Sequence, residues 1–259
     1  MISTQTISVP MVSGPALVAE NLYRFFHAGD DETLALRGVS LTIERGEVVA
    51  ISGPSGSGKS TLLACLAGLD EPDGGMVTVA GLALSRRPEG ERASLRARHI
   101  GLLFQTNNLF DHLSIEANVA LAQRLAGPVD THRIDSLLVE LGIGHRREAR
   151  PSQLSGGESA RAGLAVALAN DPAVILADEP TGELDTTTAC TVLELLLSRA
   201  RAGAAVVIVT HSAAVASSAT RQIHLRDGRV DDGVGERKDA LPLNSGLFST
   251  STMAASVTA

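Results

Sequence analysis

The sequence has little aromatic, cysteine or lysine content. Only 2% of its 259 residues are aromatic, and none of them is tryptophan. Two cysteines, Cys65 and Cys190, are too few for a disulfide framework, so we expect a chain that folds in a reducing compartment. Only two of the 22 basic residues are lysines, Lys59 and Lys238. The place of each lysine in the sequence is therefore informative.

Long apolar runs and an excess of positive charge are also missing. Segments such as "AVILA" and "AAVVIV" are far shorter than the ~20 residues that a membrane-spanning helix needs. A formal net charge of −7 argues against broad electrostatic binding to nucleic acid. The start "MISTQTISVP" lacks the basic and apolar regions of a secretion signal. We expect a cytoplasmic chain that reaches any membrane through a partner.

The sequence alternates short β-branched runs with helical periods. This pattern predicts an α/β fold in which helices cover a largely parallel sheet. With 44% hydrophobic residues, the chain can form one large domain with a substantial core. Residues 105–173 contain no convincing strand and are read as a helical insertion. Strands are predicted at Leu17–Leu22, Val39–Ile43, Val48–Ser52, Met76–Val79, Ile100–Phe104, Val174–Ala177, Val206–Thr210 and Gln222–Leu225, and helices from near Gly58, Ser114, Thr131, Gly156, Thr186 and Ser212.

The two ends of the chain differ from this pattern. The segment from Gly233 is rich in Ser, Thr, Ala and Gly, which is typical of poorly ordered chain. We therefore predict tails at residues 1–16 and 233–259.

A glycine-rich motif, "GPSGSGKST", lies between the apolar strand "EVVAIS" and the helical segment "TLLACLAGL". In this context a loop can turn its backbone N–H groups around phosphates at a helix N-terminus. Lys59 is placed for the β- and γ-phosphates of a nucleotide, and the Ser60 hydroxyl for Mg²⁺. The predicted phosphate-binding residues are Gly53, Ser55, Gly56, Ser57, Gly58, Lys59, Ser60 and Thr61.

Two acids end the apolar strand "AVILADE". Ligands bind at the carboxyl ends of strands in open α/β sheets, so Asp178 and Glu179 are placed beside the phosphate loop. Asp178 is a candidate Mg²⁺ ligand, and Glu179 a candidate base that polarises the attacking water. The alternative is a strand that simply ends in two solvated acids, and the neighbouring phosphate loop makes this alternative less favoured.

Five further elements occur in order: Gln105 in "LLFQTNNLF", "LSGGE" at Leu154–Glu158, "ADEP" from Ala177, "TGELD" from Thr181 and His211 in "VIVTHS". With them, residues 17–232 resemble the ATP-binding subunit of an ABC transporter, an ATPase. The resemblance implies a P-loop NTPase fold with a mostly parallel core sheet, an antiparallel N-terminal β-subdomain and a helical subdomain inserted at about residues 106–170. It implies ATP and Mg²⁺ as cofactors.

The resemblance also implies a purpose for the glycine pair of "LSGGE". In ABC ATPases two copies dimerise head to tail, and the signature Ser-Gly-Gly of one copy contacts the γ-phosphate held by the other. Ser155, Gly156 and Gly157 would then form a second anion-binding site whose ligand lies on a neighbouring subunit. Capping of a helix that begins at Gly156 is a compatible structural reading.

Other roles follow by resemblance. Gln105 would contact Mg²⁺ and the attacking water, and His211 the γ-phosphate. Asp185 would couple the two sites of the dimer. Adenine would stack on Phe26 in "YRFF", in preference to Tyr23 or Phe25.

Some positions depart from the family pattern. Gln or Arg commonly follows "LSGGE", but here Ser159 does. "AVAL" with Val166 stands where "ARAL" is usual, and Ser212 where Asp usually follows the His. None of these changes removes a phosphate or metal ligand. They bear on turnover and on the coupling between subunits.

"GLD", "FQTNNLFDHLSIEANV" and "ILADEPTGELD" look similar to the lipoprotein-release and macrolide-export subgroup. The resemblance implies a homodimer of ATP-binding subunits that drives a separate transmembrane permease from the cytoplasmic face of the cell membrane, with no nucleic acid. The alternative is a soluble ABC ATPase acting on nucleic acid or ribosomes, which typically carries a coiled-coil insertion or tandem ATPase domains. A P-loop kinase or GTPase would lack the signature.

A small apolar cluster surrounds Gln105 in the sequence. Phe104 and Phe110 lie beside Leu109 and Leu113, in a chain with few aromatic residues. This concentration predicts a groove for a short cytoplasmic helix of the permease. Ordinary core packing is the alternative, and it is favoured for Phe104.

Overall fold

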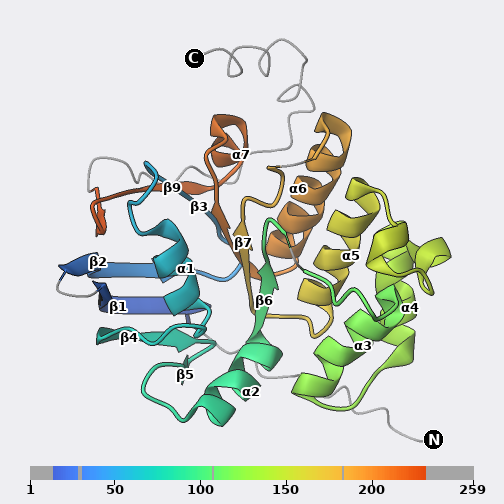
Figure 1. Cartoon of the computed structure of the whole chain (residues 1–259), viewed down its shortest axis with the longest axis horizontal. Helices are drawn as coiled ribbons and strands as arrows, with labels where there is room; N and C mark the ends of the chain where they lie inside the picture. The colour runs from blue at the N-terminus through green and yellow to red at the C-terminus, as the bar shows by residue number, and fades with distance from the viewer. Residues whose placement is uncertain (1–13, 29–30, 107, 183, 232–259) are drawn as a thin grey trace, which may run out of the picture.

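Alternating apolar strands and helices build a central six-stranded sheet (Figure 1). The computed structural model of the chain describes residues 14–28, 31–106, 108–182 and 184–231. The sheet order is β10-β9-β3-β8-β7-β6, and all pairings are parallel except that of β10 with β9. Its strands are β3 (Val48–Ser52), β6 (Ile100–Leu103), β7 (Val174–Asp178), β8 (Ala205–Val209), β9 (Arg221–Arg226) and β10 (Arg229–Val230).

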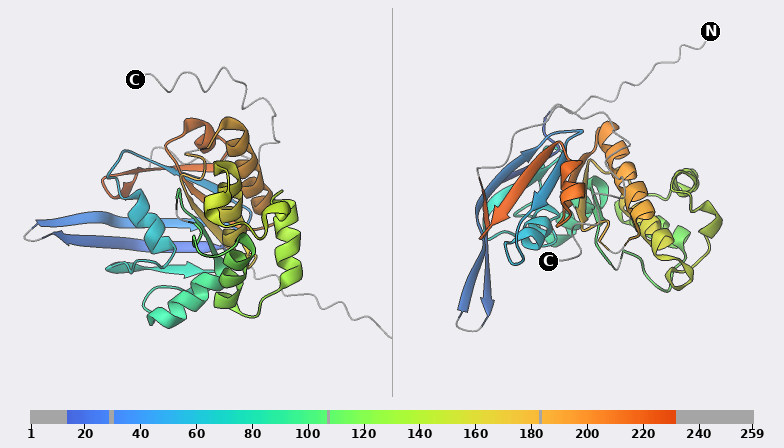
Figure 2. Two further views of the ribbon diagram at one scale, coloured as in Figure 1. Left: turned by 45° about the vertical axis from the view of Figure 1, so that its right-hand side comes forward. Right: turned by 90° about the horizontal axis from the view of Figure 1, so that it is seen from above.

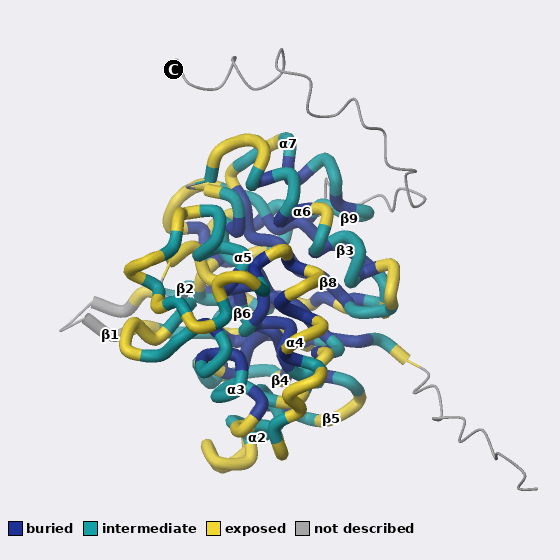
Figure 3. Tube along the Cα trace, turned by 90° about the vertical axis from the view of Figure 1, so that its right-hand side faces the viewer, coloured by how far each residue is buried: buried dark blue, intermediate teal, exposed yellow. Residues whose placement is uncertain are grey.

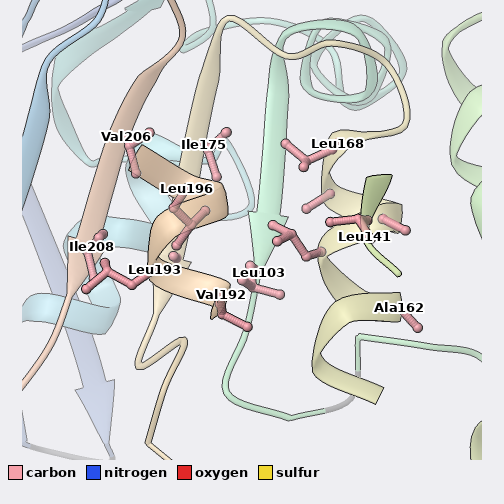
Figure 4. Close-up of a cluster of buried hydrophobic side chains, with 14 of the residues drawn as sticks. Leu103, Leu141, Ala162, Leu168, Ile175, Val192, Leu193, Leu196, Val206 and Ile208 are labelled. Atoms are coloured by element: carbon pink, nitrogen blue, oxygen red, sulfur yellow. The ribbon is translucent and has the colours of Figure 1, made fainter. Parts of the chain in front are cut away.

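The central strands are apolar throughout because both faces of this sheet are covered. Val206 and Ile208 of β8 face one hydrophobic cluster, and Val207 and Val209 face another. The first cluster packs against α5 (Gly156–Leu168) and α6 (Thr186–Arg201), as Figure 4 shows for several of its side chains. The second packs against α1 (Lys59–Leu66) and the other sheet. In Figure 3 these strands are the buried interior, while exposed residues gather on outer turns.

A second, antiparallel sheet has the order β2-β1-β4-β5. Figure 2 shows its two long strands projecting beyond the helices. The register between β1 and β2 shifts so that Ala35 is an extra residue on β2, opposite the step from Arg24 to Phe25. Such bulges re-aim the chain near functional sites. The strands are β1 (Leu17–Ala28), β2 (Asp31–Ile43), β4 (Gly74–Val79) and β5 (Leu82–Ala83).

Helices fill the segment between β6 and β7. It contains α3 (Ile115–Ala126), α4 (Thr131–Glu140), two 3₁₀ turns (Gly144–Arg146 and Pro151–Gln153) and α5. The predicted starts of these helices, of α1 and α6, and of α7 (Ala213–Ser217) are confirmed to within about a residue. Side chains cap five of the helices at their N-termini: Ser114, Asp130, Ser155, Asp185 and Ser212.

One helix, α2 (Glu89–His99), and the short strands β5 and β10 were not predicted. α2 has no fully buried residue, and its sequence, "EGERASLRARH", is mostly polar; its one leucine, Leu95, packs partly buried against the second cluster. Arginines attach it to the loop after α1. Arg92 pairs with Glu71, and Arg96 Nη1 donates to the Gly68 carbonyl over 2.8 Å.

Two predictions from the sequence need correction. Core packing is the favoured prediction for Phe104, but its side chain is 39% exposed, whereas Leu109, predicted to line the groove, packs against the core. Phe110 is 57% exposed, as the groove prediction expects. Ala16 is fully buried and its N–H donates to Ile43, so the ordered chain begins before residue 17. The predicted tails otherwise lie outside the described residues, as does Lys238.

Within the described residues, no helix has both the length and the apolar character needed to cross a membrane.

Candidate nucleotide-binding site

The phosphate loop runs from the end of β3 into the N-terminus of α1. Gly58 occupies the N-cap position of α1 and has no side chain to offer, and the first turn contains no acidic residue. The first N–H groups of a helix have no partners within the helix and carry partial positive charge. No side chain therefore occupies the cap position of α1, and its N-terminus is open to an anion.

Close approach of neighbouring backbone explains two glycines of this loop. A Cβ atom at Gly53 would lie 2.1 Å from the carbonyl oxygen of Leu225. At Gly58 it would lie 2.5 Å from the carbonyl oxygen of Ala35, the bulged residue of β2. Both glycines also have positive φ, so a side chain would be strained as well as crowded.

Lys59 lies inside the loop with only 7% of its surface exposed. Its Nζ donates to the carbonyl oxygens of Gly53 and Pro54, over 2.9 and 2.8 Å. An ammonium group has three protons, so one remains after these two bonds. The loop thus holds a buried positive charge at the N-terminus of α1, which suits a nucleotide phosphate.

A cavity of about 530 Å³ opens over this loop, a size typical of small-molecule sites. Gly53 and Ser57 are not among the residues that line it. The Ser57 hydroxyl is buried and has no hydrogen-bond partner among the described residues. Predicted site residues that line the cavity are Phe26, Ser55, Gly56, Gly58, Lys59, Ser60, Thr61, Gln105, Asp178, Glu179 and His211.

Glu179 is held in an unusual conformation at the edge of this cavity. Its φ is 45°, in the left-handed region that non-glycine residues rarely adopt. Its Oε1 accepts the backbone N–H of His211 over 2.7 Å, and its Oε2 accepts the Thr210 hydroxyl over 3.1 Å. The His211 Nε2 lies 3.8 Å from Oε1. These bonds fix a carboxylate beside the phosphate loop, as a water-orienting base requires.

Asp178 suits a cation. Burial, together with the charge of Glu179, raises the pKa of its carboxyl, although Lys59 and His211 act to lower it. A bound cation would offset this cost of holding the carboxylate charged. Ser60 and Gln105 bring further oxygen atoms to the same cavity. This donor set is the kind that Mg²⁺ takes.

The signature residues lie elsewhere. Ser155 and Gly156 are exposed and do not line the cavity. Ser155 caps α5 in a reciprocal pair with Glu158: its Oγ accepts the Glu158 N–H, and Glu158 Oε2 accepts the Ser155 N–H over 2.9 Å. The Ser155 backbone bond, followed by the Arg146 ion pair, lowers the pKa of Glu158 to about 2.

Asp185 also lies outside the cavity, at the N-cap of α6. It accepts the Thr187 and Thr188 N–H groups and the Thr188 hydroxyl, and these bonds lower its pKa. A Cβ at Gly157 would lie 2.9 Å from the Thr188 Oγ1. The signature helix therefore touches the start of α6, and the structure assembles the signature residues and Asp185 into one surface.

Sequence reasoning missed several residues of the site. Thr210, which orients Glu179, stands within "VIVTHS" but was not singled out. Arg24, whose guanidinium carbon lies 4.9 Å from the Phe26 ring centroid, has two acidic partners, Asp70 and Asp73. The available signal was "GLDEPD" directly after the phosphate-loop helix, which places acids at its C-terminal end.

The fold and the cavity together define a P-loop nucleotide-binding protein. Residues 36–182 match the ABC transporter family. Relatives include macrolide export ATP-binding/permease proteins of Aeromonas hydrophila subsp. hydrophila, 46% identical over 83% of this chain and 34% of theirs, and of Burkholderia pseudomallei, 43% identical over 87% and 35%. The chain thus spans about a third of the length of these curated relatives.

Solved structures agree. The dimeric structure of a bacterial ABC transporter cassette matches with a TM-score of 0.78 and 34% identity, over 88% of this chain and all of that one. A dimeric post-hydrolysis state of that ATP-binding cassette, bound to ADP and Pi, matches equally well. The chain therefore belongs to the ABC transporter family, and it is an ATP-binding ATPase cassette of that family.

Proposed function

We propose that this cassette dimerises on ATP and drives a membrane permease. The observation that supports it is the separation of two anion-binding sites on one chain. The phosphate loop lines the cavity, while Ser155 and Gly156 lie exposed outside it at the N-terminus of α5. A Cβ at Gly156 would meet no described atom within 4 Å. Such an open site fits a phosphate held by a second copy in a head-to-tail pair.

Within each site the residues take distinct roles. Lys59 and the loop N–H groups bind the β- and γ-phosphates, and Phe26 stacks on adenine. Glu179 polarises the attacking water, oriented by Thr210, and His211 contacts the γ-phosphate. Asp185 couples the two sites.

Mg²⁺ would be held by Ser60, Asp178 and Gln105, and it would neutralise charge on the phosphates. Among the described residues no group of three His, Cys, Asp or Glu could hold a metal alone. Phosphate oxygens would therefore complete the coordination.

The permease would hold the chain at the cytoplasmic face of the cell membrane. The relatives named above are ATP-binding/permease proteins, which supports a permease partner for this cassette. Residues 17–232 would form the cassette, with residues 106–170 as its helical subdomain.

The dimer is tested with two substitutions. Glu179→Gln should nearly abolish hydrolysis and leave ATP bound, so that gel filtration with Mg-ATP shows a dimer. Adding Ser155→Arg should return the protein to a monomer while each chain still binds ATP, because the phosphate loop is untouched. The matched control is Ser136→Arg, the same change at an exposed position of α4.

Three results would contradict the proposal: a Glu179→Gln protein that stays monomeric with ATP, a Ser155→Arg protein that still dimerises, or loss of ATP binding on Ser155→Arg alone. The last would place the signature in its own chain's site.

A further inference from the structure

Phe26 is one of the residues that line the cavity. Phe26 stands on the outer part of β1 and is 42% exposed, so packing against the core does not fix its ring. An aromatic ring that must present one face to a base gains from being held in place before the base arrives. The contacts around Phe26 show what holds it.

Arg24 stacks on Phe26. The two residues are two positions apart on β1, so their side chains point to the same side of the strand. The guanidinium carbon of Arg24 lies over the ring, 4.9 Å from its centroid. The cavity lining includes Phe26 but not Arg24. Arg24 therefore contacts the ring without itself lining the cavity.

Two carboxylates hold the guanidinium in turn. Asp70 accepts from Nε and Nη2 in a bidentate pair, each bond 2.8 Å long, and Asp73 accepts from Nη1 over 3.0 Å. The Arg24 side chain is only 21% exposed. A planar guanidinium with this many fixed bonds has little freedom to leave the ring.

Asp73 also steadies the strand itself. β4 begins at Gly74, so β1 beyond Tyr23 has no strand partner on that side. The Asp73 N–H donates to the Tyr23 carbonyl over 2.9 Å, and its Oδ2 accepts the Phe25 N–H over 2.7 Å. One aspartate thus extends the pairing of β1 up to the residue before Phe26.

We propose that Arg24, clamped by Asp70 and Asp73, is a positioning residue that fixes the Phe26 ring for the base of the bound nucleotide. This inference rests on the proposed stacking of adenine on Phe26. The clamp lies in the loop directly after α1, whose N-terminus bears the phosphate loop. The base wall and the phosphate site are thereby joined through one helix.

The test separates base binding from phosphate binding. Calorimetry of the full chain would measure Kd for Mg-ADP and for Mg-pyrophosphate, which lacks the base. Arg24→Gln should weaken ADP binding about three- to fivefold, the scale of one cation–π contact, and leave pyrophosphate binding unchanged. Phe26→Leu should weaken ADP binding about tenfold, again without effect on pyrophosphate. The double variant should bind ADP no more weakly than Phe26→Leu, because Arg24 acts through the ring.

Two further variants guard against a mere effect on folding. Arg24→Lys keeps the charge but not the plane that stacks, so its ADP affinity should fall between those of wild type and Arg24→Gln. Arg92→Gln is the matched control. Arg92 pairs with Glu71 of the same loop, whereas the guanidinium that lies over Phe26 is that of Arg24. Arg92→Gln should leave the ratio of the two Kd values unchanged.

The outcomes are distinct. Equal weakening of ADP and pyrophosphate by Arg24→Gln, or additive losses in the double variant, would overturn the positioning role. If Phe26→Leu weakens ADP and Arg24→Gln does not, the inference fails while the adenine site stands. If Phe26→Leu leaves ADP binding unchanged, the proposed adenine site itself fails.

A fluorescent reporter checks the same point independently. The chain has no tryptophan, so Phe26→Trp introduces a single indole at the ring position. Its emission should respond to ADP and not to pyrophosphate. Arg24→Gln in that background should shift the ADP titration to higher concentration. An unshifted titration would count against the clamp.

Discussion

At the scale of single residues, the site depends on one carboxylate held in a costly conformation. Glu179 has a left-handed backbone, which costs about 1–3 kcal/mol for a non-glycine residue and persists only where surrounding bonds enforce it. Those bonds come from the turn after β8, through the His211 N–H and the Thr210 hydroxyl. Thr210 is itself 1% exposed, and its Oγ1 also accepts the Ser212 N–H. The carboxylate that we propose as the catalytic base is thus oriented by a buried hydroxyl.

Replacement of this hydroxyl should separate catalysis from binding. Thr210→Val keeps the shape and removes the bond to Glu179, so we expect kcat for ATP hydrolysis to fall about ten- to a hundredfold with KM little changed. Steady-state ATPase assays give both constants. Thr220→Val is the matched control: among the described residues its hydroxyl bonds to the backbone of Val48, and neither residue lines the cavity. An equal loss of kcat in both variants would show a general effect of destabilisation.

Single residues also show where sequence reasoning reached its limit. Some site residues could be assigned because each lies at a strand end or a helix start that the sequence pattern predicts. These are Lys59, Asp178, Glu179 and the loop glycines. Arg24 could not be assigned in this way, because its partners lie 46 and 49 residues further along the chain: "GLDEPD" shows that acids follow the phosphate-loop helix, but not that they pair with Arg24.

At the scale of secondary structure, predictable elements are those that bury an apolar face or carry a cap. The β3, β7 and β8 strands are continuous apolar runs, and five helices begin at a capping side chain. α2 has no side-chain cap and only Leu95 packed against a core cluster, and arginine bonds attach it to the loop after α1. The far ends of β1 and β2 were not predicted either. They pair with each other and project from the core, so their sequences show no alternation of buried and exposed residues.

The cap of the signature helix should make stability depend on pH. Because the folded pKa of Glu158 is about 2, below its ordinary 4.5, its contribution to stability is fully present above pH 4.5 and is lost as pH falls towards 2. Glu158 Oε1 pairs with Arg146 and lies 3.5 Å from His145 Nε2, and Glu158→Gln removes its negative charge. We expect the variant to melt at lower temperature than wild type near neutral pH, with a gap that narrows below pH 4.5.

Thermal melts at a series of pH values would measure this gap. The control is Glu148→Gln, because Glu148 is exposed nearby and has no recorded bond or ion pair in the described structure. A gap that stayed constant down to the lowest pH at which wild type folds would contradict the role of the Glu158 charge.

At the scale of the whole molecule, the phosphate loop and the signature residues lie on different elements, α1 and α5, and the segment before α3 presents a further exposed surface. The backbone of Phe110 is pinned by buried Asn118: its N–H donates to Oδ1 over 2.7 Å, and its carbonyl accepts from Nδ2 over 3.2 Å. The ring is nevertheless 57% exposed and meets the ring of His112 edge-on. A rigid backbone that presents an exposed aromatic ring is typical of an interface anchor.

This surface yields a prediction about the permease. Phe110→Asp should reduce the amount of cassette that co-purifies from membranes with the proposed permease by about fivefold or more, because charge replaces an aromatic anchor. Folding and ATP binding should remain, since the ring is largely outside the core. Leu109 is a poorer choice, because it packs against the core and an acid there would destabilise the cassette. Val139→Asp, at a 72% exposed position of α4, is the matched control. If the Phe110→Asp cassette co-purifies as wild type does, the proposed permease binds elsewhere. If Phe110→Asp and Val139→Asp reduce co-purification equally, the added negative charge is responsible and not the loss of the aromatic ring.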